Sequence, residues 1–263
     1  MAIYHDQMVV LKSRAYRDHD AILTLFGRTN GKVAAIAKGV RRPKSKLAGQ
    51  VSPLTFSVVT LYHGRSSLDT VTEADLQRGF PRVAEDLERL GWAMVLADVV
   101  DQLWPEREAS EESFVVLLSA LDALNEGRSA ASVGLAAGFR FLRIAGFSPD
   151  WGACGGCQRP PLEGPITVDL ENGIVYCADC RAGTSSVCER ISLGSLRSLQ
   201  YWLKDHPNKY GQAEVKGSMK EELKRLFFRY VLHETARPLK SYEFLANVDR
   251  LSSGPEGGEK IDH

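Results

Sequence analysis

The chain has 263 residues, 44% of them hydrophobic, and its 33 Lys and Arg side chains balance 33 Asp and Glu side chains. This length exceeds the usual size of one compact domain and predicts two or three separate cores. Zero net charge excludes a protein coated uniformly with cations for nucleic acid. The amino end lacks a signal-peptide pattern and no stretch of about 18 apolar residues occurs, which predicts a cytoplasmic protein that makes no membrane contact.

The first 80 residues predict a small β-barrel. Alternating apolar residues and turn signals predict five strands, at residues 8–16, 21–28, 32–38, 55–62 and 68–75. The long connection at residues 39–53, between the third and fourth strands, favours an OB-type Greek-key barrel. An SH3-like barrel also has about five strands, so strand count alone leaves both open.

Charge in this region is one-signed. Between Ala21 and Leu68 there is no Asp or Glu, although eight Lys and Arg residues occur. A merely solvated face usually mixes charges, because self-repulsion lowers stability, so the pattern favours a nucleic-acid surface. In residues 38–42, Gly39 permits close backbone approach and two adjacent arginines can fork onto phosphate oxygens. The predicted DNA-binding residues are Arg28, Lys32, Lys38, Arg41, Arg42, Lys44 and Lys46.

Four aromatic residues of the predicted barrel are candidates for base stacking. Phe26 and Phe56 lie in apolar runs, which favours the core. Tyr16 and Tyr62 lie at strand ends, and both roles stay open for them.

From Pro81 the hydrophobic period becomes helical. Three amphipathic helices are predicted, marked in turn by Val83, Leu87, Leu90, Met94, Leu96 and Val99, by Phe114, Leu117, Leu118 and Leu121, and by Leu135, Phe139, Leu142 and Ile144. Between Glu85 and Glu126 there are 11 acidic residues against Arg89 and Arg107. They fall at helix starts and solvent faces, which explains them without catalysis.

Two Cys-x-x-Cys steps form the most specific motif of the chain. Cys154 and Cys157 are separated by 19 residues from Cys177 and Cys180. Residues 166–169 and 174–176 are strand-like and flank an Asn-Gly turn, so a hairpin would bring the two steps together. The motif predicts one structural Zn(II) per chain, closed by four thiolates. Disulfides are disfavoured by the odd number of cysteines, five in all, and a redox site normally has one such step.

Two further helices are predicted after the cysteines. Ser192 can cap a helix that runs to about Lys204 and ends at residues 206–208, and Ser218 and Glu221 form a capping box for the next, which Pro238 ends. The second helix carries a basic face, Lys220, Lys224, Arg225 and Arg229. This face fits nucleic acid, an acidic partner peptide or plain solvation. Cys188 lies outside the zinc spacing and is interpreted as a small buried or loop thiol.

Motifs for catalysis are missing. The sequence has no Walker loop, nucleophile elbow, HExxH step or clustered Asp pair. The interpretation is therefore that the protein is not an enzyme.

The order of these parts resembles the bacterial RecO recombination-mediator family over nearly the whole chain, to about Val248. The resemblance rests on residues 18–26, 37–42 and 139–146 and on the four spaced cysteines, which are common but not universal in that family. It implies a DNA repair protein that binds single- and double-stranded DNA and anneals complementary strands. It further implies that RecR is a partner, and that the two help load RecA onto strands coated by single-stranded DNA-binding protein, at the bacterial nucleoid.

The expected fold is thus α+β, and its parts follow one another along the chain. They are an OB-fold DNA-binding domain (1–80), a helical domain (81–148 and 190–248) interrupted by a zinc module (149–189), and a disordered tail (249–263). Two other functions stay open at this point: a zinc-ribbon protein acting on RNA or in transcription, and a nuclease or other hydrolase.

Overall fold

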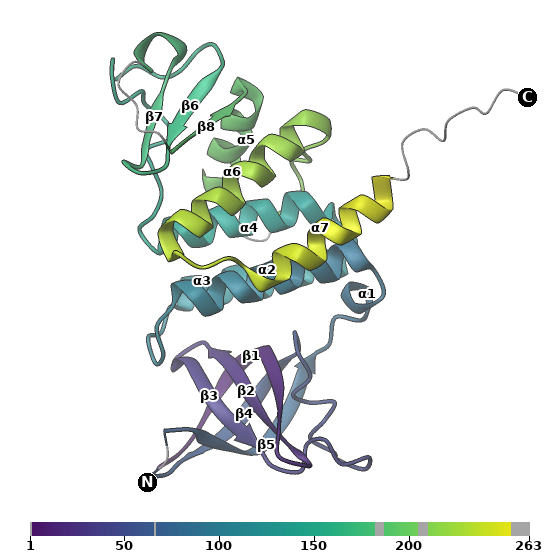
Figure 1. Ribbon diagram of the computed structural model, residues 1–263. Coiled ribbons are helices and arrows are strands. Elements are labelled where there is room, and N and C mark those ends of the chain that lie inside the picture. Colours follow the sequence, from purple (N-terminus) through teal and green to yellow (C-terminus); the bar gives the residue numbers. More distant parts are fainter. Residues whose placement is uncertain (1, 66, 182–186, 205–209, 254–263) are drawn as a thin grey trace, which may run out of the picture.

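The structure is a computed structural model that describes residues 2–65, 67–181, 187–204 and 210–253. Figure 1 shows a β-barrel at the bottom, a layer of helices above it and a small sheet at the top. The predicted α+β class, with the barrel first in the chain, is confirmed.

The barrel is closed, with the strand order β1-β2-β3-β5-β4. Its strands are β1 (Ala2–Tyr16), β2 (Asp20–Gly27), β3 (Gly31–Ala37), β4 (Phe56–His63) and β5 (Asp69–Arg78). Strand β1 pairs with both β2 and β4, and β3 runs parallel to the start of β5. A simple meander contains no parallel neighbours, so the observed strand order is that of a Greek key. It agrees with the OB-type barrel that the sequence favours.

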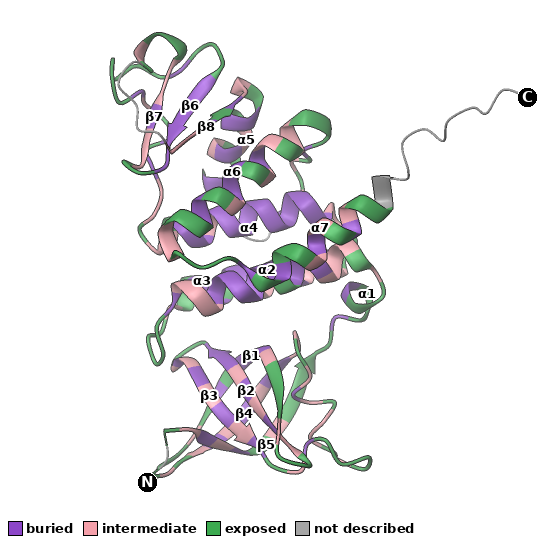
Figure 2. Cartoon of the chain, in the orientation of Figure 1, coloured by how far each residue is buried: buried purple, intermediate pink, exposed green. Residues whose placement is uncertain are grey.

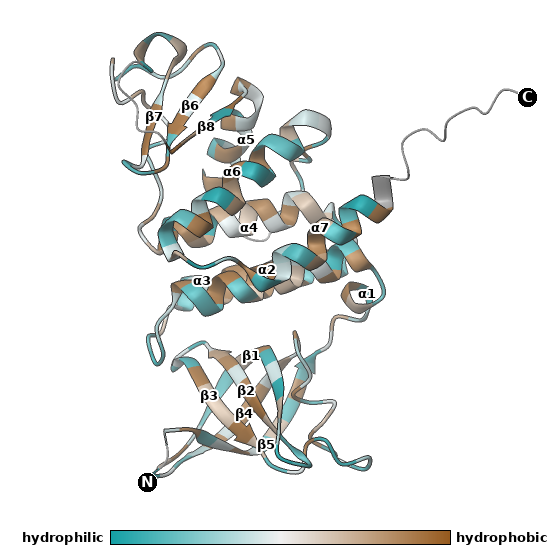
Figure 3. Cartoon of the chain, in the orientation of Figure 1, coloured by the Kyte–Doolittle hydropathy of each residue, from teal (hydrophilic) through white to brown (hydrophobic). Residues whose placement is uncertain are grey.

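Alternation along the strands builds the barrel core. The odd-numbered residues Leu23, Leu25 and Val33 point inward and are at most 1% exposed, whereas Ile22 and Ile36 lie on the outer face and are half-buried. Figure 3 shows brown bands along β2, β3 and β4, which supply most of this core. The five predicted strands and their period are confirmed, although β1 begins at Ala2, six residues before its predicted start, and β5 runs three residues beyond its predicted end.

The middle layer consists of helices on both sides of the cysteine segment. They are α1 (Pro81–Ala84), α2 (Leu87–Leu103), α3 (Glu111–Asn125), α4 (Ala130–Ile144), α5 (Leu193–Lys204), α6 (Gly217–Thr235) and α7 (Lys240–Ser253). Helix α4 lies at the centre and is buried along almost its whole length (Figure 2). Two of its glycines allow close packing, since a Cβ at Gly134 would lie 2.1 Å from Trp92 and one at Gly138 would lie 2.5 Å from Phe227.

The first predicted helix differs from the observed one. The chain breaks after α1, and the Asp86 side chain caps α2 by accepting a hydrogen bond from the Arg89 backbone N–H at 3.0 Å. Leu87 and Met94, expected to point inward, are 53% and 37% exposed. Helix α2 touches α3, α4 and α7, so it is buried on more than one side and no single apolar stripe describes it.

The carboxyl end also differs from expectation. Helix α7 was not predicted, and it reaches Ser253, so a disordered tail is wrong for residues 249–253; residues 254–263 lie outside the described part. The helix packs along α2, where a Cβ at Gly91 would lie 2.8 Å from Leu245. The Ser241 backbone N–H donates to the buried Asp98 carboxylate at 2.8 Å.

The two predicted caps have different outcomes. Ser192 accepts from the Ser195 backbone N–H at 3.2 Å and so caps α5 as expected; the predicted end of that helix at residues 206–208 lies outside the described residues. The capping box at Ser218 is wrong, because α6 begins at Gly217 and its N-cap residue is Lys216, whose side chain makes no capping bond.

The small top sheet has the order β7-β6-β8. Its strands are β6 (Ile166–Asp169), β7 (Ile174–Tyr176) and β8 (Cys188–Ile191), with the 3-10 turn η1 (Ala178–Cys180) after β7. The predicted hairpin between β6 and β7 is confirmed, and Gly173 takes the positive φ of 63° that its Asn-Gly turn requires.

Aromatic side chains join the barrel to the helices. Phe26 and Phe56 point out of the barrel and belong to the helical core, which confirms their packing role. The Phe114 ring lies 6.5 Å from that of Phe26 and 6.0 Å from that of Phe56, and the Trp104 ring lies 6.1 Å from that of Phe26. The two layers thus share one continuous apolar contact.

The loop between α2 and α3 adds a polar clamp to this contact. The Arg107 backbone N–H donates to the Lys32 carbonyl at 2.8 Å, and Glu106 forms a parallel bridge with Lys32. The loop passes so close to the β2–β3 turn that a Cβ at Gly31 would lie 2.2 Å from the Glu108 carbonyl oxygen. Glycine at position 31 therefore permits the domain contact as well as the turn.

Arg107 reaches from this loop to a buried carboxylate of the barrel. Asp69 is 0% exposed, lies 2.8 Å from the Arg107 guanidinium and 2.7 Å from His63 Nδ1, and accepts from the Tyr4 hydroxyl. Burial favours the protonated carboxyl, but hydrogen bonds from Tyr4, His63 and Arg107 outweigh it and hold the pKa of Asp69 below its ordinary value of 3.8. Burial and the bond to Asp69 raise the pKa of Tyr4 to about 12.

Asp69→Asn should lower the free energy of unfolding at neutral pH by about 2 kcal/mol, the usual range for hydrogen bonds to a buried charge. Because the folded pKa of Asp69 is depressed, its contribution is present above pH 3.8 and is lost as pH falls through the folded pKa. Urea unfolding at pH 7 and near pH 3 should show the gap to the native protein shrinking in acid. Asp75→Asn, an exposed carboxylate on the same strand, is the control; a gap of equal size at both pH values would contradict this role.

Candidate nucleic-acid interface and metal centre

The connection between β3 and β4 presents five of the seven predicted DNA-binding residues together. Lys38, Arg41, Arg42, Lys44 and Lys46 are all exposed. Among the residues that the structure describes, none of the five lies within ion-pair distance of an acidic side chain. The positive charge of this connection is therefore uncompensated.

Hydrogen bonds to the β1–β2 hairpin and two buried valines hold this connection in place. The Arg41 backbone N–H donates to the His19 carbonyl at 2.9 Å, and that of Gly39 donates to the Asp20 carboxylate at 2.7 Å. Val40 and Val51 are buried in the barrel core. Gly39 has a φ of 64°, so the backbone of the turn favours glycine at this position. Space does not require it, because a Cβ there would meet only Arg42, at 3.5 Å.

The other two predicted residues lie elsewhere and are engaged. Arg28 Nε lies 2.9 Å from the Glu111 carboxylate, at the start of α3. The Lys32 ammonium is 3.1 Å from the Asp101 carboxylate, with a side chain only 13% exposed. The structure thus separates both from the basic connection and places them in the contact between barrel and helices.

The β1–β2 hairpin contributes two cations that the sequence argument missed. Arg14 and Arg17 are exposed and lie outside the acid-free window, because Asp18 and Asp20 interrupt the charge pattern there. The Asp20 carboxylate is used by the Gly39 backbone N–H, which local charge counting does not reveal. The Arg41 guanidinium donates to the Arg17 carbonyl at 3.4 Å, so the hairpin and the basic connection touch.

The basic face of α6 has a packing role. Lys224 pairs with Asp249 of α7, and Arg225 and Arg229 both pair with Glu189 of β8, whose side chain is 6% exposed. Arg225 Nε lies 2.9 Å from that carboxylate. Three of the four cations thus tie α6 to neighbouring elements.

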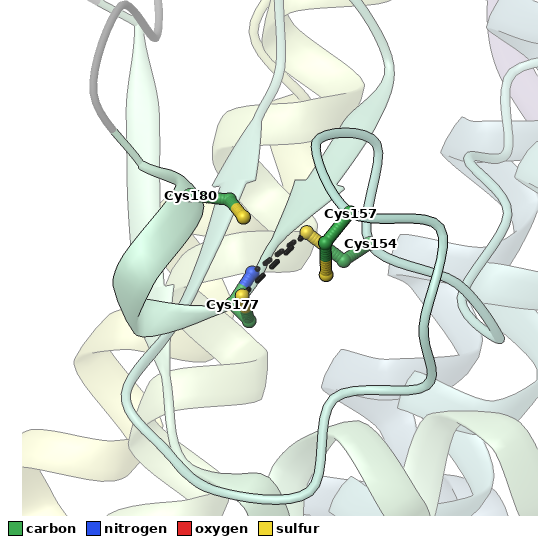
Figure 4. A group of neighbouring side chains, drawn as sticks. All are labelled: Cys154, Cys157, Cys177 and Cys180. Carbon is green, nitrogen blue, oxygen red and sulfur yellow. Dashed lines mark hydrogen bonds between the residues drawn. The ribbon is translucent and has the colours of Figure 1, made fainter.

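The four spaced cysteines converge at the open end of the β6–β7 hairpin (Figure 4). Their sulfur atoms all lie within 4.8 Å of one another, and the Cys154 and Cys177 sulfurs are 3.7 Å apart. Cys154 and Cys157 precede β6, Cys177 follows β7, and Cys180 ends η1. The grouping that the spacing predicts is present, and its four sulfurs can hold a metal ion.

Backbone contacts shape the first cysteine turn. The Gly155 N–H donates to the Val175 carbonyl at 2.8 Å, which fastens the turn to β7. A Cβ at Gly155 would lie 2.2 Å from Ile174, and one at Gly156 would lie 2.7 Å from the Cys180 Cβ. The two glycines are required because the first cysteine turn lies so close to β7 and to the second cysteine turn.

Electrostatics around the sulfurs favour a thiolate at Cys154. Burial alone would raise its pKa, but backbone N–H groups of Cys157, Cys177 and Gly156 lower it to about 6. Hydrogen bonding to Cys177 is the largest cause, and desolvation the next, of the raised pKa of Cys180, which is about 12. A cation bound among the sulfurs would compensate the clustered negative charge. Cys188 lies in β8, outside this group.

Comparison with known proteins decides the family. The protein-family model described as "Recombination protein O N terminal" matches residues 1–80, and the family model described as "Recombination protein O C terminal" matches residues 84–243. The chain belongs to the RecO family. A DNA repair protein RecO of Symbiobacterium thermophilum is 32% identical over 248 residues, 93% of this chain and 97% of the relative. Another RecO, of Pelotomaculum thermopropionicum, is 32% identical over 262 residues, 100% of both chains.

Membership of the RecO family gives the chain a role in DNA repair and recombination. The two family models meet near residues 80–84, where the barrel ends and the helices begin. Across the described residues, no helix combines the length and hydrophobicity that spanning a membrane requires.

Proposed function

We propose that this RecO-family protein is a recombination mediator that binds single- and double-stranded DNA at the end of its barrel. The observation that carries the proposal is the group of five exposed, uncompensated cations on the connection between β3 and β4. Phosphate neutralisation supplies most of the affinity of non-specific DNA binding, and adjacent arginines can each fork onto phosphate oxygens. Arg28 and Lys32 are left out, since acidic residues of the helices hold them.

Strand annealing follows from the same chemistry. Two complementary strands repel each other through their phosphates, and a cationic surface that neutralises both lowers that repulsion without ATP. With RecR, the protein then promotes loading of RecA on strands coated by single-stranded DNA-binding protein. Its proposed setting is the bacterial cytoplasm, at the nucleoid.

Replacing both Arg41 and Arg42 by Glu should weaken binding to DNA of any sequence. The slope of log affinity against log salt on single strands should flatten by about 1.4, because each lost phosphate contact removes about 0.7. Fluorescence anisotropy at several salt concentrations measures both quantities. Arg28→Gln is the matched control and should leave the slope unchanged, because Glu111 already engages Arg28. An unchanged slope in the double variant would contradict the proposal that DNA binds at the end of the barrel.

Annealing of two complementary labelled oligonucleotides should be faster with the protein than without it, in the absence of ATP. The Arg41→Glu/Arg42→Glu variant should lose this acceleration. The same oligonucleotides with Mg(II) or Mn(II) test for cleavage, which would instead support a nuclease. Tighter binding to structured RNA than to single-stranded DNA would favour the alternative, a zinc-ribbon protein acting on RNA or in transcription.

We also propose that Cys154, Cys157, Cys177 and Cys180 hold one structural zinc ion. Four sulfurs at about 2.3 Å from a tetrahedral zinc ion lie about 3.8 Å apart, close to the 3.7 Å between Cys154 and Cys177. Four thiolates fill the coordination shell, leaving no position for a substrate. The ion would hold the two cysteine turns together.

Cys154→Ser together with Cys177→Ser should abolish stoichiometric zinc and lower the melting temperature, because metal affinity contributes directly to folding of such modules. Elemental analysis of the purified protein and thermal melting measure the two effects. Cys188→Ser, which lies outside the sulfur group, should keep both the zinc and the melting temperature. Native protein purified without chelators and found free of zinc would exclude this assignment.

A further inference from the structure

The end of the β1–β2 hairpin extends beyond the part of β1 that pairs with β4. Strand β1 pairs with β4 only over residues 2–9, and a bulge follows between Val10 and Lys12. Beyond it, β1 pairs only with β2, as far as the Tyr16–Asp20 pair. Every residue of 13–15 and 17–19 is exposed. This part of the hairpin therefore adds surface to the barrel and no core.

Strand register places several hairpin side chains on one outer face. Arg14 is opposite Ile22, and Ile22 is opposite Ile36 of β3, so these three share a row across the sheet. Tyr16 lies two residues beyond Arg14 and points to the same face. Ile22, Ile36 and Tyr16 are all partly exposed. The outcome is an apolar strip with an arginine and a tyrosine along its margin.

The helices cover only the other end of this same face. Phe26 and Lys32 are opposite each other in the β2–β3 register and are held by Trp104 and Asp101. Lys12, two residues before Arg14, pairs with Asp98 at 2.6 Å. The part that carries Tyr16 and Arg14 is thus the part of the face that the helical layer leaves open.

Arg17 has an unusual backbone for its side chain. Its φ is 53°, a left-handed conformation that is unfavourable for a residue other than glycine. The side chain is exposed, so packing does not explain why glycine or asparagine is absent. Its guanidinium carbon lies 5.1 Å from the centre of the Tyr16 ring. Such local strain is typical of functional positions.

We propose that this hairpin is the part of the interface that distinguishes single strands from duplex. An unpaired base stacks on the Tyr16 ring, taking the place of the Arg17 guanidinium, and Arg14 and Arg17 contact the neighbouring phosphates. In a duplex the bases are already stacked on each other, so none is free to stack on Tyr16. The arginines, in contrast, can contact the phosphates of both single strands and duplex. The inference rests on the proposed DNA binding by the basic connection, which touches the hairpin at Arg17 and His19.

Tyr16→Ala should weaken binding to single-stranded DNA roughly 5- to 150-fold, the range that loss of one stacked base gives. Duplex affinity should stay unchanged, as should the salt slope, because no charge is removed. Tyr16→Phe should bind like the native protein, since stacking needs only the ring. Tyr62→Ala, another partly exposed tyrosine at a strand end, is the matched control and should bind normally.

A second measurement separates stacking from a change in fold. The fluorescence of a single-stranded oligonucleotide that carries 2-aminopurine should be quenched when it is saturated with the native protein or with Tyr16→Phe. Saturation with Tyr16→Ala should leave the fluorescence unquenched, and the melting temperature of this variant should equal that of the native protein. Equal losses on single and double strands, or no loss on either, would overturn the role of the hairpin. By contrast, an Arg41→Glu/Arg42→Glu variant that binds both DNA forms normally would overturn the proposed DNA surface itself.

Discussion

The contact between the outer wall of the barrel and helices α2 and α3 determines how the rest of the molecule is arranged. Phe26 and Phe56 leave the barrel core and enter the helical core, where Phe114 lies against both rings. Aromatic pairs of this kind bury a large area and fix orientation. The barrel is therefore held in one orientation, with part of its outer wall covered by helices and its basic connection exposed.

Charge is divided along the same line. The acidic residues of α2 and α3 account for the zero net charge, and some of them also pair directly with the barrel: Asp101 lies 2.7 Å from Lys12 and 3.1 Å from Lys32, and Glu111 engages Arg28. Pairing engages the cations near the helices, whereas those on the β3–β4 connection form no ion pair with any residue that the structure describes. A basic region that is uniform in sequence thus becomes two regions in space, one paired with the helices and one exposed.

The features that the sequence predicted correctly depend on local signals. Strand alternation, the Asn-Gly turn before β7 and the two cysteine steps each depend on residues close together in the chain. The errors depend on distant partners. Leu87 and Met94 are exposed because α2 has neighbours on several sides, and α7 forms along α2 with Leu245 against Gly91. The ion pairs of Arg28 with Glu111 and of Lys32 with Asp101 likewise join residues far apart in the chain, and local charge counting does not reveal them.

The cysteine module is a small unit that depends on contacts outside its own strands. Its strands have three or four residues each, too few to build an independent core, and small units of this kind usually need a metal or another cross-link. The module is fastened to the helices by Glu189, a buried carboxylate that both Arg225 and Arg229 contact. The apolar residues Ile166, Val168 and Ile191 of this sheet also belong to the helical core, so the sheet packs on the helices through both apolar and charged contacts. The barrel, in contrast, has a core of its own.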